Sequence, residues 1–232
     1  MIDARLYNSR QVLMHAAGDA VNEHAEALRS AACQIDEISE ALTSAQTVDA
    51  IRGYEGTAAN LYFGAFGHMI KSNDPDLQFN GRNRRPPKDP VNALLSYLYT
   101  LLAAETEGAL ESVGLDPACG YMHTLRSGRP ALALDLMEEF RAPVCDRIAL
   151  ALINRKQING KDFETGEDGG IVMKPKARDK LLQVWQEKKR DSIYHPALDE
   201  KVSIGLLPYS QALLLARVLR GDTDSYPAFR WR

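Results

Sequence analysis

Three acidic side chains and one histidine stand in surroundings that suggest chemistry rather than a solvated surface. Glu55 lies between two glycines in the run GYEGTAANLYF, while Asp135 and Glu138 lie three apart in the apolar run ALALDLMEEF. A buried carboxylate is costly unless it is paired or binds a metal, and a spacing of three places two carboxyls on one helix face. His123, in GYMHTLRSG, adds an imidazole. The question is whether these groups meet in the fold.

An oxygen-rich set with one imidazole is a workable site for a hard divalent ion, and it suits Mg²⁺ or Mn²⁺ better than zinc. Such ions serve phosphoryl transfer because they activate the attacking oxygen and neutralise phosphate charge. Simpler interpretations exist for each residue. Glu55 could be a first-turn residue favoured by the helix dipole, His123 a loop histidine, and Asp135 with Glu138 a solvated face. Spacing alone leaves these alternatives open.

A dense group of cations precedes the helix predicted to begin at Pro90. Its members are Arg82, Arg84, Arg85 and Lys88. Cations at this place favour contacts with nucleic-acid phosphates over a solvated face or a structural ion pair, and the neighbouring prolines lower the entropy cost of ordering the loop. The clusters at 188–190 and at Arg217 with Arg220 are better explained as solvated faces or structural ion pairs.

The composition is that of an ordinary globular protein. The 232 residues are 45% hydrophobic and 25% charged, with a net charge of −3, so bulk charge alone does not indicate a nucleic-acid binder. The three cysteines form no C-x-x-C pair, which favours a reducing compartment over a disulfide framework or a zinc site. No run has the length of a membrane span, and the first residues lack a signal-peptide layout. We expect a cytoplasmic protein.

Helical periodicity dominates the chain and predicts a mainly α fold in a single domain over residues 1–232. Apolar residues recur at helical spacing through 8–50, and a helix continues from residue 46 with Glu55 inside it or at its start. Pro, Gly, Asn and Asp content predicts a loop at 72–90. Two further helices are predicted at 175–190 and 208–220.

Local signals refine three of these boundaries. Asp89-Pro90 opens a helix that Gly114 is placed to cap. The apolar run that begins at Ala131 is helical with a predicted break near Pro143. Within the loop region 157–175, residues 157–159 and 171–173 carry the strand-like hints, and they predict one short β-hairpin.

Four long motifs together resemble one known family. The motifs are IRGYEGTAANLYF, NGRNRRPPKDPVNALLSYLYTLL, VGLDPACGYMHTLRSGRPALALDLMEEFRAPVCDR and LLPYSQALLLARVLRGDTDSYPAFRW. In order and in coverage they resemble the helical C-terminal domain of the CRISPR-associated spacer-acquisition integrase (Cas-one) family. The second motif is most similar to the subtype I-C branch.

The resemblance implies a metal held by Glu55, His123 and Glu138, with Asp135 beside it. Many members carry Asp where this chain has Glu138, and the longer carboxylate keeps the ligand type. Asn92 and Ser96, four apart on one helix face, match an asparagine and a small polar residue of the family site. They are expected to position the site or to contact DNA.

The implied activity is that of a metal-dependent endonuclease and integrase of antiviral CRISPR adaptation. The 3′-hydroxyl of a short duplex attacks a phosphodiester of the repeat array, and with water as nucleophile the same site acts as a nuclease. Implied partners are double-stranded and branched DNA, a second copy of the chain and the small ferredoxin-like adaptation protein. Family members begin with a β-rich domain, and this sequence is expected to start after it.

Three rival interpretations remain at this point. One is a non-catalytic DNA-binding scaffold of the same fold, against which the intact set of Glu55, His123 and Glu138 argues. Another is a related integrase serving a mobile element. The last is a helical metal-dependent hydrolase of small phosphates, which would cleave nucleotides but not polymeric DNA.

Overall fold

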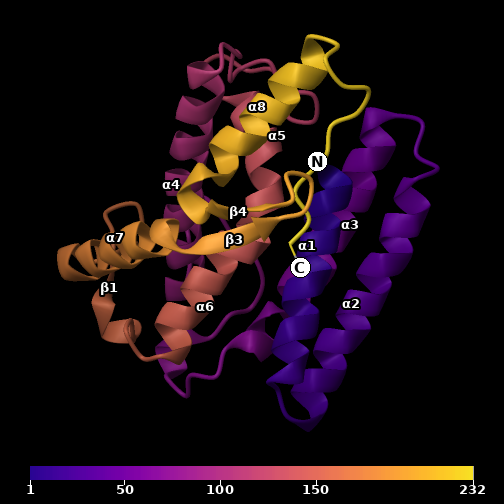
Figure 1. Ribbon diagram of the computed structural model, residues 1–232. Helices are drawn as coiled ribbons and strands as arrows, with labels where there is room; N and C mark the ends of the chain where they lie inside the picture. Colours follow the sequence, from indigo (N-terminus) through magenta and orange to yellow (C-terminus); the bar gives the residue numbers. More distant parts are fainter. Residues whose placement is uncertain (232) are drawn as a thin grey trace.

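The computed structural model describes residues 1–231 and consists mainly of helices (Figure 1). The long helices are α1 (Ile2–Gly18), α2 (Asn22–Leu42), α3 (Val48–Phe66), α4 (Pro90–Ser112), α5 (Ala131–Phe140), α6 (Arg147–Asn154), α7 (Pro175–Arg190) and α8 (Leu207–Leu219). Short helical turns are η1 (Gly67–Met69), η2 (Pro75–Leu77), η3 (Arg141–Asp146), η4 (Gly160–Asp162) and η5 (Ile204–Leu206). The predicted mainly α fold class is confirmed.

The first three helices pack beside one another (Figure 1), and α3 carries Glu55. The predicted helical stretch 8–50 is present, but it is divided into α1 and α2 and has short connections before α2 and α3. Thr47 caps α3 by accepting a hydrogen bond from the backbone N–H of Ala50 at 3.1 Å, a strongly favoured helix start.

Helix α4 begins and ends where the local signals predict. Asp89 is its N-cap and accepts a hydrogen bond from the backbone N–H of Asn92 at 2.8 Å, and Pro90 fills the first turn. Gly114 lies just beyond the helix with φ +79°, a backbone conformation that glycine adopts without strain. The loop predicted at 72–90 is present over 72–89, apart from the short turn η2, because Pro90 already belongs to α4.

The central helix runs through α5, η3 and α6 without a break. Nearly every residue of α5 is buried, as expected of a helix that is apolar on most of its faces. The predicted break near Pro143 is wrong, because η3 is a turn of π-helix that takes the proline into a continuous helical path. A widened turn accommodates a residue that cannot donate a backbone hydrogen bond.

Two short antiparallel hairpins complete the fold. In the first, β1 (Phe163–Thr165) pairs with β2 (Ile171–Met173), with Phe163 opposite Met173. The predicted hairpin in 157–175 is therefore present and its second strand is correct, but residues 157–159 are not a strand. The second hairpin, β3 (Ser192–His195) with β4 (Glu200–Ser203), was not predicted.

The C-terminal tail folds back along α1. Asn8 donates hydrogen bonds to the carbonyl oxygens of Glu139 and Phe229 at 2.7 and 2.9 Å, and its own side-chain oxygen accepts one from the backbone N–H of Trp231 at 2.7 Å. Phe229 and Trp231 are buried in the same apolar core as the long helices. No helix in residues 1–231 combines the length and apolar character needed to cross a membrane.

Candidate active site

Glu55 lies well inside α3 rather than at its start. It is the eighth residue of a helix that begins at Val48, so the helix-dipole interpretation does not apply, since that effect falls off within the first turn. A Cβ atom added to Gly53 or Gly56 would meet no described atom within 4 Å. Packing therefore does not require these glycines, and the helix surface on either side of Glu55 is open.

Glu138 is buried and is held by two arginines. Its Oε1 accepts a hydrogen bond from Arg141 Nη1 at 2.6 Å, and its Oε2 lies 3.0 Å from Arg5 Nε. Arg5, itself only 8% exposed, also forms an ion pair with Glu55 through Nη1. A single guanidinium from α1 thus joins carboxylates from α3 and α5.

Charge keeps Glu138 ionised in spite of its burial. Burial alone would raise the pKa of this carboxyl, but the charges of Arg141 and Arg5 bring the pKa below its ordinary value. Burial lowers the pKa of Arg5, against the opposing effect of Glu138. The solvated-face interpretation of Asp135 and Glu138 is wrong, because both side chains are buried.

Asp135 holds His123 and the loop that carries it. Its two oxygens accept hydrogen bonds from the backbone N–H groups of Tyr121, Met122 and His123 at 2.6, 2.9 and 3.0 Å, and Oδ1 lies 2.6 Å from His123 Nδ1. Burial raises the pKa of Asp135, but these hydrogen bonds outweigh burial and bring it below its ordinary value. Asp135 therefore orients the imidazole.

A glycine lets this loop approach the central helix. A Cβ atom at Gly120 would lie 2.6 Å from the backbone carbon of Ala131, so only glycine fits there. Arg52 adds a second restraint, because its Nε and Nη2 donate to the carbonyl oxygen of Met122 at 2.9 and 2.6 Å. The loop histidine is thus fixed from α3 and from α5.

The predicted ligands come from three distant segments, and two of them, Glu55 and Glu138, meet at Arg5. His123 is joined to Asp135, which lies three residues before Glu138 on α5. Across residues 1–231, however, no three His, Cys, Asp or Glu side chains form a ready metal-binding group. The guanidinium of Arg5 lies between the two carboxylates.

The donor set fits a hard divalent ion. Two carboxylates and an imidazole suit Mg²⁺ or Mn²⁺, and an imidazole whose Nδ1 is held by a carboxylate leaves Nε2 as the ligand atom. Glu138 Oε2 is buried and receives no well-directed hydrogen bond despite its proximity to Arg5. That atom has unused capacity for a cation.

Arg82 and Asn92 build the wall next to this cluster. Arg82 donates to Asn92 Oδ1 at 2.6 Å and to Ser96 Oγ at 3.0 Å. Asn92 is fully buried and its amide donates to the Gly81 carbonyl at 2.9 Å. Of the two predicted roles for Asn92 and Ser96, these contacts favour positioning of the loop, and contact with DNA stays a prediction.

The other cations of the basic loop are exposed. Partial burial and the charge of Arg141 lower the pKa of Arg84. Arg84, Arg85 and Lys88 form no ion pair with a described carboxylate. They are free to bind an anion.

Sequence reasoning missed Arg5 and Arg141. Arg141 follows Glu138 by three residues, a spacing that predicts contact on a helix. The sequence therefore contained the information needed to predict this ion pair. Arg5 offered no comparable pattern. Arg141 also stacks over Tyr99 at 4.1 Å from the ring centroid, which fixes the guanidinium from its other side.

Comparison with known proteins agrees with the resemblance. The family model described as CRISPR associated protein Cas1 matches residues 1–187. A relative from Rhodospirillum rubrum, named CRISPR-associated endonuclease Cas1 2, is 49% identical over 100% of this chain and 69% of its own length. A CRISPR-associated endonuclease Cas1 from Leptospira interrogans is 42% identical over 100% of this chain and 91% of its own length.

Solved structures share the fold. A partial Cas6-RT-Cas1–Cas2 complex contains a chain with a TM-score of 0.82 and 27% identity, covering 99% of this chain and 66% of that one. A casposase bound to integration product has a TM-score of 0.81 at 24% identity, covering 99% of this chain and 62% of that one, and it shows the fold alone. This chain thus spans about two thirds of these proteins. The family match and the identity to its curated endonucleases establish that the chain belongs to the CRISPR-associated Cas1 family.

Proposed function

We propose that this chain is the catalytic helical part of a metal-dependent DNA endonuclease and integrase of CRISPR adaptation. The observation that carries the proposal is the joining of Glu55 and Glu138 through Arg5 beside Arg141, with His123 held by Asp135 on the same helix as Glu138. Carboxylates with an imidazole suit a hard cation, and arginines suit phosphate, so the two groups together favour chemistry on a phosphodiester.

Glu55, Glu138 and Nε2 of His123 would hold Mg²⁺ or Mn²⁺ in this proposal. When bound, the ion supplies an acidified nucleophile and neutralises charge on the phosphate. Asp135 fixes the imidazole by its contact with Nδ1, which leaves Nε2 as the ligand atom. Arg5 stabilises the two carboxylates when no ion is present. Its guanidinium has to move away from the space between them when an ion binds.

The arginines bind and orient the DNA phosphate. Arg84 is exposed on the basic loop, and Arg82 and Arg141 both lie over the ring of Tyr99. The 3′-hydroxyl of the incoming strand attacks phosphorus, the new phosphodiester forms, and the cut strand leaves with a free 3′-hydroxyl. Replacement of that hydroxyl by water gives hydrolysis. The open surface at Gly53 and Gly56 leaves room for the substrate backbone.

The partners follow from the relatives. Solved neighbours are Cas1–Cas2 complexes, so we propose that this chain assembles as a homodimer with the small ferredoxin-like adaptation protein on double-stranded and branched DNA. We also keep the subtype I-C branch and a cytoplasmic location as predictions.

The test is Mn²⁺-dependent cleavage and strand transfer on a branched DNA. Glu55→Gln and His123→Ala are expected to reduce the rate at least about a hundredfold, whereas Glu111→Gln, an exposed carboxylate on α4, leaves it unchanged. Manganese binding measured by electron paramagnetic resonance gives a readout that needs no turnover. Unaltered manganese binding and unaltered rates in both site variants would refute the assignment.

A further inference from the structure

Arg52 is a charged residue of α3 to which the proposed chemistry assigns no role. Its Nε and Nη2 donate to the carbonyl oxygen of Met122 at 2.9 and 2.6 Å, and its Nη1 donates to Asp49 at 2.8 Å. The contact with Asp49 stays within one turn of α3, whereas the contact with Met122 joins positions 70 residues apart in the chain. Two of the three guanidinium nitrogens are thus used to hold a distant loop.

The loop that Arg52 holds, residues 121–125, is here called the histidine loop because it contains His123. Within residues 1–231, the hydrogen bonds that join this loop to the rest of the chain involve only Arg52 and Asp135. Asp135 accepts bonds from backbone N–H groups, and Arg52 donates to a backbone carbonyl. A functional side chain keeps its geometry only when its supports are themselves fixed, so both contacts bear on the position of the imidazole.

Three side chains close a circuit of contacts through the predicted metal ligands. Arg52 joins α3 to the histidine loop, and Asp135 joins that loop to α5. Arg5 then joins Glu138 of α5 back to Glu55 of α3. Since Arg52 and Glu55 are three apart on α3, they are neighbours on one helix face. Arg52 is therefore the direct link between the helix that carries Glu55 and the loop that carries the imidazole.

We propose that Arg52 is a positioning residue that holds His123 in register with Glu55 for the binding of a divalent cation. Ordering a mobile ligand at the moment of binding costs free energy, so a site whose ligands are already in place binds its ion more tightly. Arg52 supplies this order by attaching the histidine loop to the helix that carries Glu55. The choice of a divalent cation as the ligand rests on the proposed function.

A simpler role for Arg52 would be that of a surface ion pair with Asp49. The two side chains are 41% and 89% exposed, and exposed pairs of this kind contribute little to stability. Asp49→Asn removes the carboxylate and leaves both hydrogen bonds to the Met122 carbonyl. This variant therefore separates the ion pair from the attachment of the histidine loop.

The first arm of the test follows amide hydrogen exchange of the full chain in EDTA, without DNA. The backbone N–H groups of Tyr121, Met122 and His123 are all bonded to Asp135, so their exchange reports opening of the histidine loop. Arg52→Gln is expected to speed exchange at these three amides about tenfold, the lower end of the effect of a hydrogen bond to a charged group. Arg52→Lys keeps a charged donor and should give a smaller increase.

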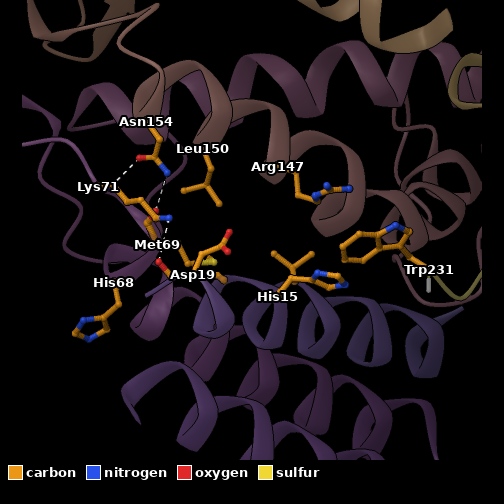
Figure 2. Close-up of a pocket in the computed structure, with 11 residues that line it drawn as sticks. His15, Asp19, His68, Met69, Lys71, Arg147, Leu150, Asn154 and Trp231 are labelled. Atoms are coloured by element: carbon orange, nitrogen blue, oxygen red, sulfur yellow. Dashed lines mark hydrogen bonds between the residues drawn. The ribbon is translucent and has the colours of Figure 1, made fainter. Parts of the chain in front are cut away.

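Arg147 provides a matched control outside the circuit. Figure 2 shows its side chain beside Trp231 at the edge of a cavity of about 220 Å³, and its guanidinium lies 4.4 Å from the centroid of the Trp231 ring. Arg147→Gln removes an exposed guanidinium that has a defined contact, as Arg52→Gln does. This variant and Asp49→Asn are both expected to leave the exchange of the three loop amides unchanged.

The second arm measures Mn²⁺ binding by electron paramagnetic resonance, again without DNA. Arg52→Gln is expected to weaken Mn²⁺ binding about tenfold, the lower end of the effect of removing a support behind a metal ligand. The same change is then made in His123→Ala. If Arg52 acts through the imidazole, Arg52→Gln should have no further effect on Mn²⁺ affinity once the imidazole is gone, whereas a general loss of structure would lower the affinity in both backgrounds.

Two results would overturn the inference. Equal exchange in Arg52→Gln, Asp49→Asn and Arg147→Gln would show that Arg52 does not fix the histidine loop. An unaltered Mn²⁺ affinity in Arg52→Gln, or an equal loss of affinity with and without His123, would show that it does not position the imidazole. Failure of Mn²⁺ to bind the parent protein would count against the proposed function instead, and the exchange arm would still decide whether Arg52 holds the loop.

Discussion

Glu138 and Glu139 are neighbours on α5, and both are buried, yet their surroundings differ completely. Glu138 faces Arg5 and Arg141, and its pKa lies below the ordinary value. For Glu139, burial raises the pKa to about 7. A step of one residue turns a helix by about 100°, so the two side chains leave the same helix toward different partners.

The hydrogen-bond partners of Glu139 are neutral, although the positive charge of the N-terminal amino group also acts on its carboxyl. Its Oε2 accepts hydrogen bonds from the backbone N–H of Phe229 at 2.7 Å and from Gln211 Nε2 at 2.9 Å, while Oε1 is buried without a hydrogen-bond partner among the described residues. Gln211 in turn contacts His195 Nε2 at 2.9 Å. This cluster joins the C-terminal tail, α8 and the second hairpin to the central helix.

The comparison shows that burial alone does not give a carboxylate its role. Desolvation opposes the charge of both side chains. Where guanidinium groups offset the cost of desolvation, the carboxylate stays charged and is suited to bind a cation. Where neutral hydrogen-bond donors and the charge of the N-terminal amino group offset burial only in part, the pKa stays raised and the carboxyl links two parts of the chain.

Removal of the guanidinium that Glu138 shares with Glu55 should give the largest effect. Arg5→Ala leaves a buried carboxylate with one partner instead of two, and this is expected to lower the free energy of unfolding by about 3 kcal/mol in urea denaturation without metal. Added Mn²⁺ should then stabilise the variant more than the parent, because no guanidinium competes with the ion.

Arg230→Ala is the matched control for Arg5→Ala. Arg230 pairs with Asp3, but both side chains are about half exposed, so its loss should cost less than about 1 kcal/mol. Equal destabilisation of the two variants would mean that the cluster around Glu138 behaves as an ordinary surface ion pair.

Glu139 should make the folded state less stable as the pH rises from about 4.5 to 7. In the unfolded chain the carboxyl ionises near its ordinary pKa of 4.5, whereas in the folded chain it keeps its proton up to about 7. The unfolded state therefore loses its proton first, and stability falls across that window and levels off above it. Glu139→Gln removes this titration. The free energy of unfolding of the variant, relative to that of the parent, should therefore rise by about 3 kcal/mol between pH 5 and pH 8.

Glu138→Gln tests the same comparison from the other side. Because the folded pKa of Glu138 lies below 4.5, its contribution is present above pH 4.5 and is lost only as the pH falls through the lower value. The difference between this variant and the parent should stay constant from pH 5 to 8 in urea denaturation. A difference from the parent that changes with pH for Glu138→Gln, together with a constant difference for Glu139→Gln, would reverse the assignment of the two environments.

Local signals predicted the scaffold better than they predicted the site. Asp89, Pro90 and Gly114 carry capping information within a few residues, so the limits of α4 followed from the sequence. The strands of the second hairpin are four residues each, too short for alternation to stand out against the helical pattern around them. At Pro143 the rule that proline ends a helix failed, because a π turn absorbed it.

The candidate site was predicted only where residue types restrict the chemistry. Acidic residues in apolar surroundings pointed to Glu55, Asp135 and Glu138, and the structure buries the latter two. Asp135 holds the imidazole, whereas Glu138 faces the arginines. This difference depends on the direction of each side chain, which the sequence does not give. The role of Arg5 depends on the meeting of α1 with α3 and α5, which no local pattern records.

Asp146, a third buried carboxylate, lies between the two extremes and should give the smallest effect. Its oxygens accept hydrogen bonds from Tyr99 and Tyr62 at 2.5 and 2.8 Å, and burial raises its pKa in spite of the charge of Arg141. Tyr62→Phe removes one of two hydroxyl donors and should lower the free energy of unfolding by about 1.5 kcal/mol. Tyr54→Phe, on the same helix but without a recorded hydrogen bond to its hydroxyl, should cost less than about 0.5 kcal/mol. A loss as large as that of Arg5→Ala would show that Asp146 depends on its hydroxyl donors as strongly as Glu138 depends on its arginines, and the contrast between charged and neutral compensation would fail.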